Sequence, residues 1–140
     1  MGEYVIGQVL PYKESADIPG CYCRKSGDLI EWLNPPMIPG EEYLTAGRWN
    51  GSPVYTTLIQ REQIQESPLE IITEISADLV VSHAGCIGSH SLPVVDDSDE
   101  GMALAWVNVS VNNGLITATI ACGSDHIGET AVVQVWYTKP

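Results

Sequence analysis

Basic residues are scarce in this sequence. Its 140 residues include six Lys and Arg against 18 Asp and Glu, which gives a formal net charge of −12 at pH 7. Proteins that bind nucleic acid or anionic lipid neutralise phosphates with clusters of Lys and Arg. Six scattered basic residues cannot form such a cluster. We therefore expect neither a nucleic-acid partner nor a membrane-surface partner.

Long apolar stretches are also missing. No run approaches the ~20 apolar residues that a transmembrane helix requires, and the apolar runs present have the length of strands. Residues 1–30 contain no basic segment followed by an uninterrupted apolar stretch, because Gly7, Pro11, Lys13 and Asp17 interrupt it. A secretory signal peptide needs both features. We expect a protein without membrane insertion that is made in the cytoplasm and released by lysis.

Helix-forming segments are almost absent. The window Gln60–Ser67 is short and stops at Pro68, so we expect a loop or one helical turn there. Elsewhere apolar residues recur with a period of two, over residues 69–81, 107–111, 115–121 and 131–139. The first of these segments is either one half-buried strand or a strand pair with a bend, and Gly85 and Gly88 are expected to end it. Several short strands separated by Gly, Asn and Pro turns are typical of a sandwich. The sequence predicts an all-β fold, an antiparallel β-sandwich that is jelly-roll-like.

The N-terminal residues form a separate segment in this prediction. Residues 4–12 are expected to be a strand, residues 13–20 a polar turn, and residues 21–33 a hairpin around Ser26-Gly27-Asp28. This segment is either a lead-in from a preceding module or an edge strand of the main sheet. We divide the chain into an N-terminal lead-in, residues 1–33, and a β-sandwich module, residues 34–140.

Paired metal-ligand motifs are lacking. His83, Cys86 and His90, together with Cys122 and His126, offer ligands for zinc. None of the familiar paired spacings is present, and His83 and Cys86 would face opposite sides of a strand. The acidic run Asp96–Glu100 does not match an EF-hand calcium loop and is expected to be a solvated turn. We predict no metal site and no cofactor.

Catalytic motifs are missing as well. There is no Gly-x-Ser-x-Gly elbow, and no pair of carboxylates stands out as a glycosidase pair. Cys21 and Cys23 are two residues apart on a predicted strand, which places them badly for bridging each other. We expect these cysteines, Cys86 and Cys122 to be free thiols, and we predict no catalytic residue and no enzymatic activity.

The most informative stretch runs from residue 31 to residue 57. It contains two of the four tryptophans and four of the nine prolines. Pro35 and Pro36 exclude helix, and Pro39-Gly40 predicts a turn. Asn50-Gly51 then separates two runs rich in β-branched and aromatic residues, which is the strongest short hairpin signal. We predict a corner followed by a hairpin.

This stretch resembles the C-terminal module of bacteriophage and prophage tail-fibre and baseplate proteins. The matching pieces are NPPM at Asn34–Met37, GEEYLTAGRWNGSPVY at Gly40–Tyr55, and YTK at Tyr137–Lys139. The resemblance covers residues 31–140, and Leu33 and Ala46-Gly47 replace residues that are more often polar in that family. It implies a viral protein of the virion tail, made in the cytoplasm of the bacterial host, that forms a homotrimer and contacts other tail proteins.

Aromatic residues around the predicted hairpin suggest a ligand. Sugar rings stack on flat aromatic side chains, while amide, carboxylate and guanidinium groups bind the hydroxyls. The candidate glycan-binding residues are Trp32, Tyr43, Arg48, Trp49, Asn50 and Tyr55. We expect a non-enzymatic tail-fibre or baseplate tip module that binds bacterial surface polysaccharide. The alternatives are a carbohydrate-binding accessory module of a secreted glycan-degrading enzyme and a purely structural fibre cap.

Self-association is expected on independent grounds. Four tryptophans and six tyrosines exceed what a sandwich core about 10 Å thick readily encloses. Trp49 beside the predicted turn and Trp136-Tyr137 in the last strand would be exposed in a monomer. An interface argument alone would favour a dimer, and the trimer is implied by the resemblance.

Overall fold

The structure, a computed structural model, describes residues 10–93 and 105–140 and is almost entirely β. In chain order its strands are β1 (Lys13–Glu14), β2 (Tyr22–Ser26), β3 (Leu29–Trp32), β4 (Glu42–Trp49), β5 (Ser52–Arg61), β6 (Leu69–Ser76), β7 (Leu79–Ile87), β8 (His90–Ser91), β9 (Trp106–Asn112), β10 (Leu115–Ala121) and β11 (Ala131–Thr138). A short 3-10 turn, η2 (Ser124–His126), precedes β11. The described part of the chain contains no helix that is long and apolar enough to cross a membrane.

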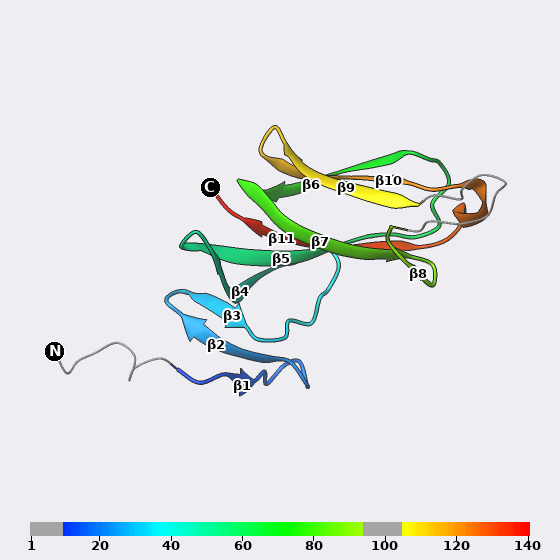
Figure 1. Cartoon of the computed structure of the whole chain (residues 1–140). Helices are drawn as coiled ribbons and strands as arrows, with labels where there is room; N and C mark the ends of the chain where they lie inside the picture. The colour runs from blue at the N-terminus through cyan, green and yellow to red at the C-terminus, as the bar shows by residue number, and fades with distance from the viewer. Residues whose placement is uncertain (1–9, 94–104) are drawn as a thin grey trace.

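The strands form two sheets that pack face to face (Figure 1). The larger sheet has the order β1-β2-β3-β4-β5-β11-β7-β8, and the smaller sheet has the order β6-β10-β9. All described pairs are antiparallel except β3–β4, which is parallel over Glu31↔Leu44 and Trp32↔Thr45. The predicted all-β sandwich is confirmed.

The core lies between β5, β11 and β7 on one side and the smaller sheet on the other. β11 alternates strictly: Ala131, Val133, Val135 and Tyr137 are all fully buried, whereas the residues between them are half-buried on the opposite face. Opposing them are Ile116, Ala118 and Ile120 of β10. This period-two burial confirms the pattern on which the sandwich was predicted. It contradicts the expectation that Trp136 and Tyr137 are exposed in a monomer, because Tyr137 faces the core and Trp136 is half-buried.

The residues before β5 take no part in this core. No residue from 10 to 58 belongs to the buried core cluster of the described chain, although Tyr55 packs against it from the side. Strands β1–β4, which we call the extension (residues 10–50), continue the larger sheet beyond the smaller one (Figure 1). Strands β1–β3 of the N-terminal segment thus form one edge of the larger sheet.

Gln60 and Arg61 end β5, and the rest of the window Gln60–Ser67 is a loop, which is one of the two expected possibilities. Residues 69–81 form two strands in different sheets, with the crossing at Ala77-Asp78, so the strand pair is observed rather than a single strand. One local expectation needs correction. Gly85 does not end a strand but lies inside β7, where a Cβ would come within 2.6 Å of the Val132 carbonyl oxygen. This glycine therefore allows close backbone approach between β7 and β11.

The N-terminal segment agrees with the prediction only in part. The hairpin expected at residues 21–33 is present as β2 and β3, joined by a tight turn between Ser26 and Leu29. Lys13 and Glu14, expected in a turn, pair with β2 as the two-residue strand β1. Most of the strand expected at residues 4–12 lies outside the described residues.

We predict that the core of the smaller sheet carries much of the stability. Ile116→Ala in β10 should lower the free energy of unfolding by about 2–5 kcal/mol, because its fully buried side chain would leave a cavity. The control Ile72→Ala, at a β6 residue that is 62% exposed, should cost less than about 1 kcal/mol. Urea denaturation followed by tryptophan fluorescence measures both. Equal losses in the two variants would contradict this assignment of the core.

Candidate functional site

The predicted hairpin is formed by β4 and β5. Trp49 pairs with Ser52, and Asn50 and Gly51 have φ values of 48° and 82°, as a two-residue turn of this kind requires. Between Leu44 and Arg48 the register shifts, so β4 bulges. The Thr45 hydroxyl donates to the Val54 carbonyl oxygen at 2.7 Å and accepts from the Gly47 amide. These two side-chain hydrogen bonds replace backbone hydrogen bonds between β4 and β5 that the bulge interrupts. The bulge sets the direction of the hairpin tip, Arg48–Gly51.

Trp32 and Tyr43 lie together on the outer face of the larger sheet, away from the smaller sheet. Their ring centroids are 5.8 Å apart and the planes are nearly perpendicular, at 89°. Tyr43 is only 7% exposed, and its hydroxyl accepts a hydrogen bond from the Ile38 amide at 3.2 Å. Tyr43 therefore holds the proline-rich corner against the sheet, which leaves its ring inaccessible to a ligand.

Tyr55 lies on the opposite face of the same sheet. Its ring stacks on that of Tyr137 with centroids 6.0 Å apart, and the Lys139 ammonium lies 5.4 Å from the Tyr55 ring centroid. The Tyr137 hydroxyl and the Lys139 ammonium both donate to the Glu42 carboxylate. Burial, followed by the hydrogen bond to Glu42 and its negative charge, raises the pKa of Tyr137 far above its ordinary value. The contacts of Tyr137 and Lys139 with Glu42 therefore join β11 and the residues after it to β4.

A buried ionic cluster holds the extension together. Glu31 of β3 is 3% exposed; it accepts hydrogen bonds from the Tyr12 hydroxyl at 2.6 Å and the Arg24 Nε at 2.8 Å. The Arg24 guanidinium also lies over the Tyr12 ring, 4.2 Å from its centroid. Burial alone would raise the pKa of Glu31, but the hydrogen bonds from Tyr12 and Arg24 and the charge of Arg24 outweigh it and hold the pKa below its ordinary value.

Arg48 takes part in the same cluster at longer range. Its Nη2 is 4.0 Å from a Glu31 carboxylate oxygen, and its Nη1 donates to the Gly47 carbonyl oxygen at 2.8 Å. The side chain is still 46% exposed, so it can meet a ligand as well.

The six candidate glycan-binding residues do not form one surface. Trp32 and Tyr43 lie on the outer face, Tyr55 lies on the opposite face, and Arg48, Trp49 and Asn50 lie at the hairpin tip. The sequence suggested one site because these residues are close along the chain, but successive residues of a strand point to opposite faces of the sheet. The hairpin tip is the one place where three of the candidates are neighbours and exposed.

Sequence reasoning missed the ionic cluster of Tyr12, Arg24 and Glu31. A signal was present, because Glu31 is a lone acid between the apolar residues Leu29, Ile30, Trp32 and Leu33. Such a position predicts a buried charge that requires partners.

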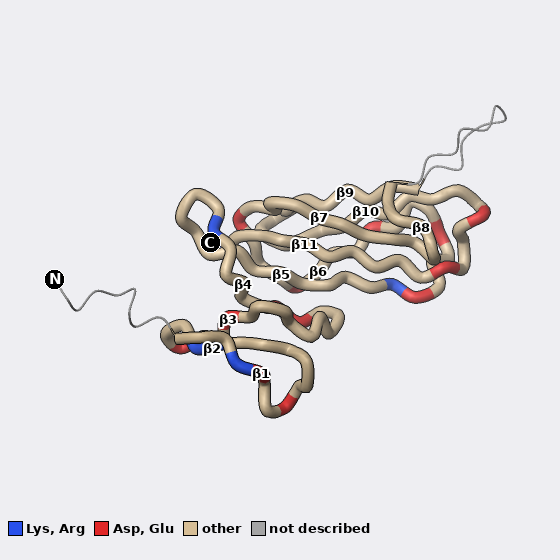
Figure 2. The backbone as a smooth tube through the Cα atoms, turned by 60° about the horizontal axis from the view of Figure 1, so that its bottom comes forward, with Lys and Arg blue, Asp and Glu red and all other residues tan. Residues whose placement is uncertain are grey.

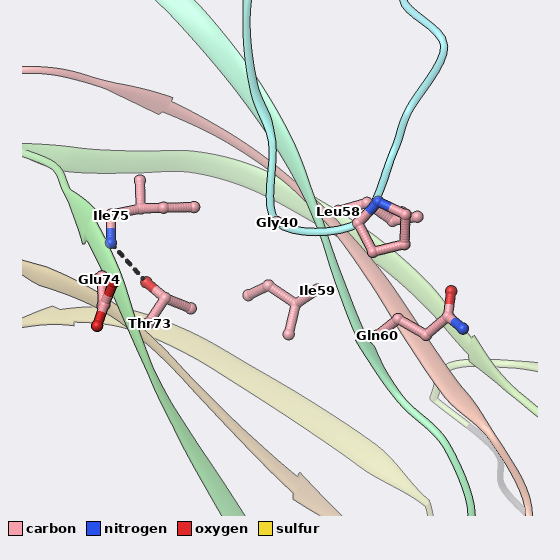
Figure 3. A pocket seen from close by; sticks show the side chains of 8 residues that line it. Gly40, Leu58, Ile59, Gln60, Thr73, Glu74 and Ile75 are labelled. Carbon is pink, nitrogen blue, oxygen red and sulfur yellow. Dashed lines mark hydrogen bonds between the residues drawn. The ribbon is translucent and has the colours of Figure 1, made fainter.

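A groove of about 380 Å³ opens where the edges of the two sheets meet (Figure 3). It is lined by Pro39, Gly40, Leu58, Ile59, Gln60, Thr73, Glu74 and Ile75. Its size is in the range of ligand pockets. Among these lining residues, however, Glu74 is the one carboxylate and none is aromatic. The groove therefore provides neither the pair of acids of a glycosidase nor a surface for stacking sugars.

The predicted thiols and histidines are distributed over several elements. All four cysteines are free and half-buried. His83 and Cys86 pair with Val135 and Val132 of β11, so they lie on opposite faces of β7, as expected from their spacing. His90 and His126 come close together, with ring centroids 5.3 Å apart. The acidic run Asp96–Glu100 lies outside the described residues.

Comparison with known proteins identifies no relative: no family model, no curated protein and no solved structure matches the chain. The resemblance to tail-fibre modules rests on the sequence pattern alone.

We predict that Glu31 stabilises the extension specifically. Glu31→Gln removes the charge that Tyr12 and Arg24 surround, and should lower the local stability of the extension by about 1–3 kcal/mol. Hydrogen exchange measured by mass spectrometry should accelerate over residues 12–32 and stay unchanged in β10. Glu74→Gln, at an exposed acid of β6, is the control and should leave both regions unchanged.

Acid provides a second check of the same cluster. Because folding lowers the pKa of Glu31, its stabilising effect is fully present above the ordinary value of 4.5 and is lost as the pH falls below it. Wild-type protein should therefore lose protection over residues 12–32 in that range, and Glu31→Gln should show a smaller change. A variant with the exchange rates and acid response of wild type would show that the cluster does not hold the extension.

Proposed function

We propose that this chain is a non-enzymatic tip module of a bacteriophage or prophage tail fibre or baseplate. In this proposal it self-associates through the extension and contributes to binding of bacterial surface polysaccharide. The observation that carries the proposal is the exposed apolar surface of the extension. The resemblance of residues 31–140 to tail-fibre modules supplies the biological setting: the virion tail, with synthesis in the host cytoplasm.

The extension exposes an unusual number of large apolar side chains. The exposed large hydrophobic residues within it are Leu10, Tyr22, Leu29, Ile30, Leu33, Ile38 and Trp49, against Ile72, Leu79, Trp106 and Ile127 in the rest of the described chain. The smaller sheet does not cover the extension, and none of its residues enters the core cluster. Exposed apolar side chains concentrated in one part of a molecule favour an interface there. A second copy of the chain would bury it.

The charge distribution favours contact through the extension. Residues 10–50 carry four basic and six acidic residues, whereas residues 51–140 carry two and eleven. Figure 2 marks the Lys and Arg positions in blue along the backbone, and blue segments lie on β1 and β2 of the extension. Copies that met through their sandwiches would bring strongly acidic surfaces together, so repulsion is smallest at the extension. A trimer is proposed because tail fibres are threefold, and other tail proteins are the second candidate partner.

The hairpin tip is the proposed contact with polysaccharide. Trp49 is 46% exposed and lies between Arg48 and Asn50 in the chain, which are exposed as well. An indole ring offers a stacking surface, and the amide and guanidinium groups are suitable for binding hydroxyls. Trp32, Tyr43 and Tyr55 would then support the hairpin rather than touch the sugar.

We predict that the wild-type chain is a trimer in solution at micromolar concentration. Ile30→Ser combined with Leu33→Ser should weaken association by at least roughly tenfold, because burying each side chain is worth about 1.5–3 kcal/mol. The matched control is Ile72→Ser combined with Leu79→Ser, which changes two exposed apolar residues outside the extension. Light scattering over a concentration series measures the mass. A wild-type mass that stays monomeric at high concentration and moderate salt would refute self-association.

We predict that Trp49 is required for binding to a host polysaccharide. On a glycan array, Trp49→Ala should lose most of the signal of the wild-type chain, since stacking on the indole ring is removed. Trp106→Ala is the matched control, because Trp106 is 42% exposed but lies on β9 in the smaller sheet. A signal that survives in Trp49→Ala and is lost in Trp106→Ala would move the binding site to the smaller sheet. A trimer that binds no glycan would favour the structural cap.

A further inference from the structure

Three potential metal ligands meet at the end of the sandwich near η2. They are His90 of β8, His126 of η2 and Glu129 in the loop before β11, and one ligand atom from each lies within 4.8 Å of the others. His126 Nδ1 is 3.0 Å from Glu129 Oε2, and the rings of His90 and His126 meet edge to face at 79°. Sequence spacing did not suggest this set, because Glu129 is not part of any Cys and His pattern.

We propose that His90, His126 and Glu129 form a zinc site. Two imidazole nitrogens and a carboxylate oxygen are a common three-ligand set for Zn²⁺, with a fourth position left for water. Zinc bound at about 2.0–2.2 Å to each ligand needs ligand atoms roughly 3.3–3.5 Å apart. His126 Nδ1 and Glu129 Oε2 are 3.0 Å apart, so they would separate by a few tenths of an ångström to admit the ion. His90 is exposed beside a turn, so a small rotation of its side chain completes the set.

The backbone around the ligands is held from two sides. Ile64, which is 1% exposed, donates its amide to the Glu129 carbonyl oxygen at 2.9 Å and accepts from the Gly128 amide at 2.7 Å. On the other side the Gly88 amide donates to the Thr130 carbonyl oxygen at 2.9 Å. These contacts fix the position of Glu129 before any ion binds, which reduces the cost of organising the site.

Gly88 also provides the space for the carboxylate. A Cβ at this residue would lie 2.5 Å from Glu129 Oε2, and its φ of 57° favours glycine independently. The turn between β7 and β8 therefore brings His90 toward Glu129 without blocking it. An ion in this position would join the β7–β8 turn, η2 and the start of β11, which no disulfide does among the described residues.

The test is zinc binding to the full chain after removal of metals with a chelator. Wild-type protein should bind one Zn²⁺ per chain in a competition assay with a chromophoric chelator, and zinc should raise its melting temperature. Loss of a residue that merely hydrogen-bonds a metal ligand lowers affinity by roughly 10–100-fold, so loss of the ligand His90 itself should cost at least as much. His90→Ala should therefore bind zinc more weakly by at least this factor, and zinc should no longer raise its melting temperature. Because His90 is exposed, this variant should fold normally without zinc.

The matched control is His83→Ala, which removes the third histidine, exposed on β7. It should bind zinc as wild type does, whereas Glu129→Gln should behave like His90→Ala. Co²⁺ in place of zinc should give d–d absorption without a thiolate charge-transfer band, because no cysteine is a ligand in this proposal. The proposal is overturned if wild-type protein binds no zinc at micromolar concentration, if His90→Ala binds as tightly as wild type, or if a thiolate band shows that cysteines hold the metal.

Discussion

The fold depends on the pairing of β11 between β5 and β7. This strand lies between β5 and β7 in the larger sheet, and its four inward side chains are fully buried against the smaller sheet. Its partners lie far away in the sequence, since Val133 pairs with Ile59 on one side and Gly85 on the other. Without β11, the larger sheet would separate into two parts and the core would lose one wall. The absence of a side chain at Gly85 makes this close pairing possible.

The extension, unlike the sandwich, is stabilised largely by polar contacts. The extension adds no residue to the core cluster of the described chain, although Tyr43 and Leu44 are buried locally. Its strands are also held by backbone ladders and by the ion cluster around Glu31. The parallel contact between β3 and β4 involves two residue pairs, and the cluster lies directly beside it. A buried charge with all its partners in place specifies one arrangement, because each alternative leaves the charge unpaired. Polar contacts thus fix the extension while its apolar side chains remain exposed for a partner.

Local features of the fold were predictable from the sequence, and long-range features were not. Asn50-Gly51 predicted its hairpin correctly because positive φ at both positions is a local requirement. The role of Gly85 was mistaken, because a glycine inside a strand cannot be told from a strand end until its neighbour is known. The candidate glycan site was dispersed for the same reason, since Tyr43 and Tyr55 face opposite sides once β4 and β5 are paired. Glu129 follows His126 by only three residues, but His90 reaches this pair from the distant turn between β7 and β8, which the sequence does not indicate.

The uneven distribution of charge makes the molecule electrically polar along its length. The sandwich carries most of the excess negative charge, and four of the six basic residues lie in the extension. Close to a negatively charged surface, within a Debye length of about 8–10 Å, the sandwich is repelled more strongly than the extension. The resulting torque turns the molecule so that the extension, with its hairpin tip, faces the surface. The charge distribution thus orients the molecule toward such a surface before any specific contact forms.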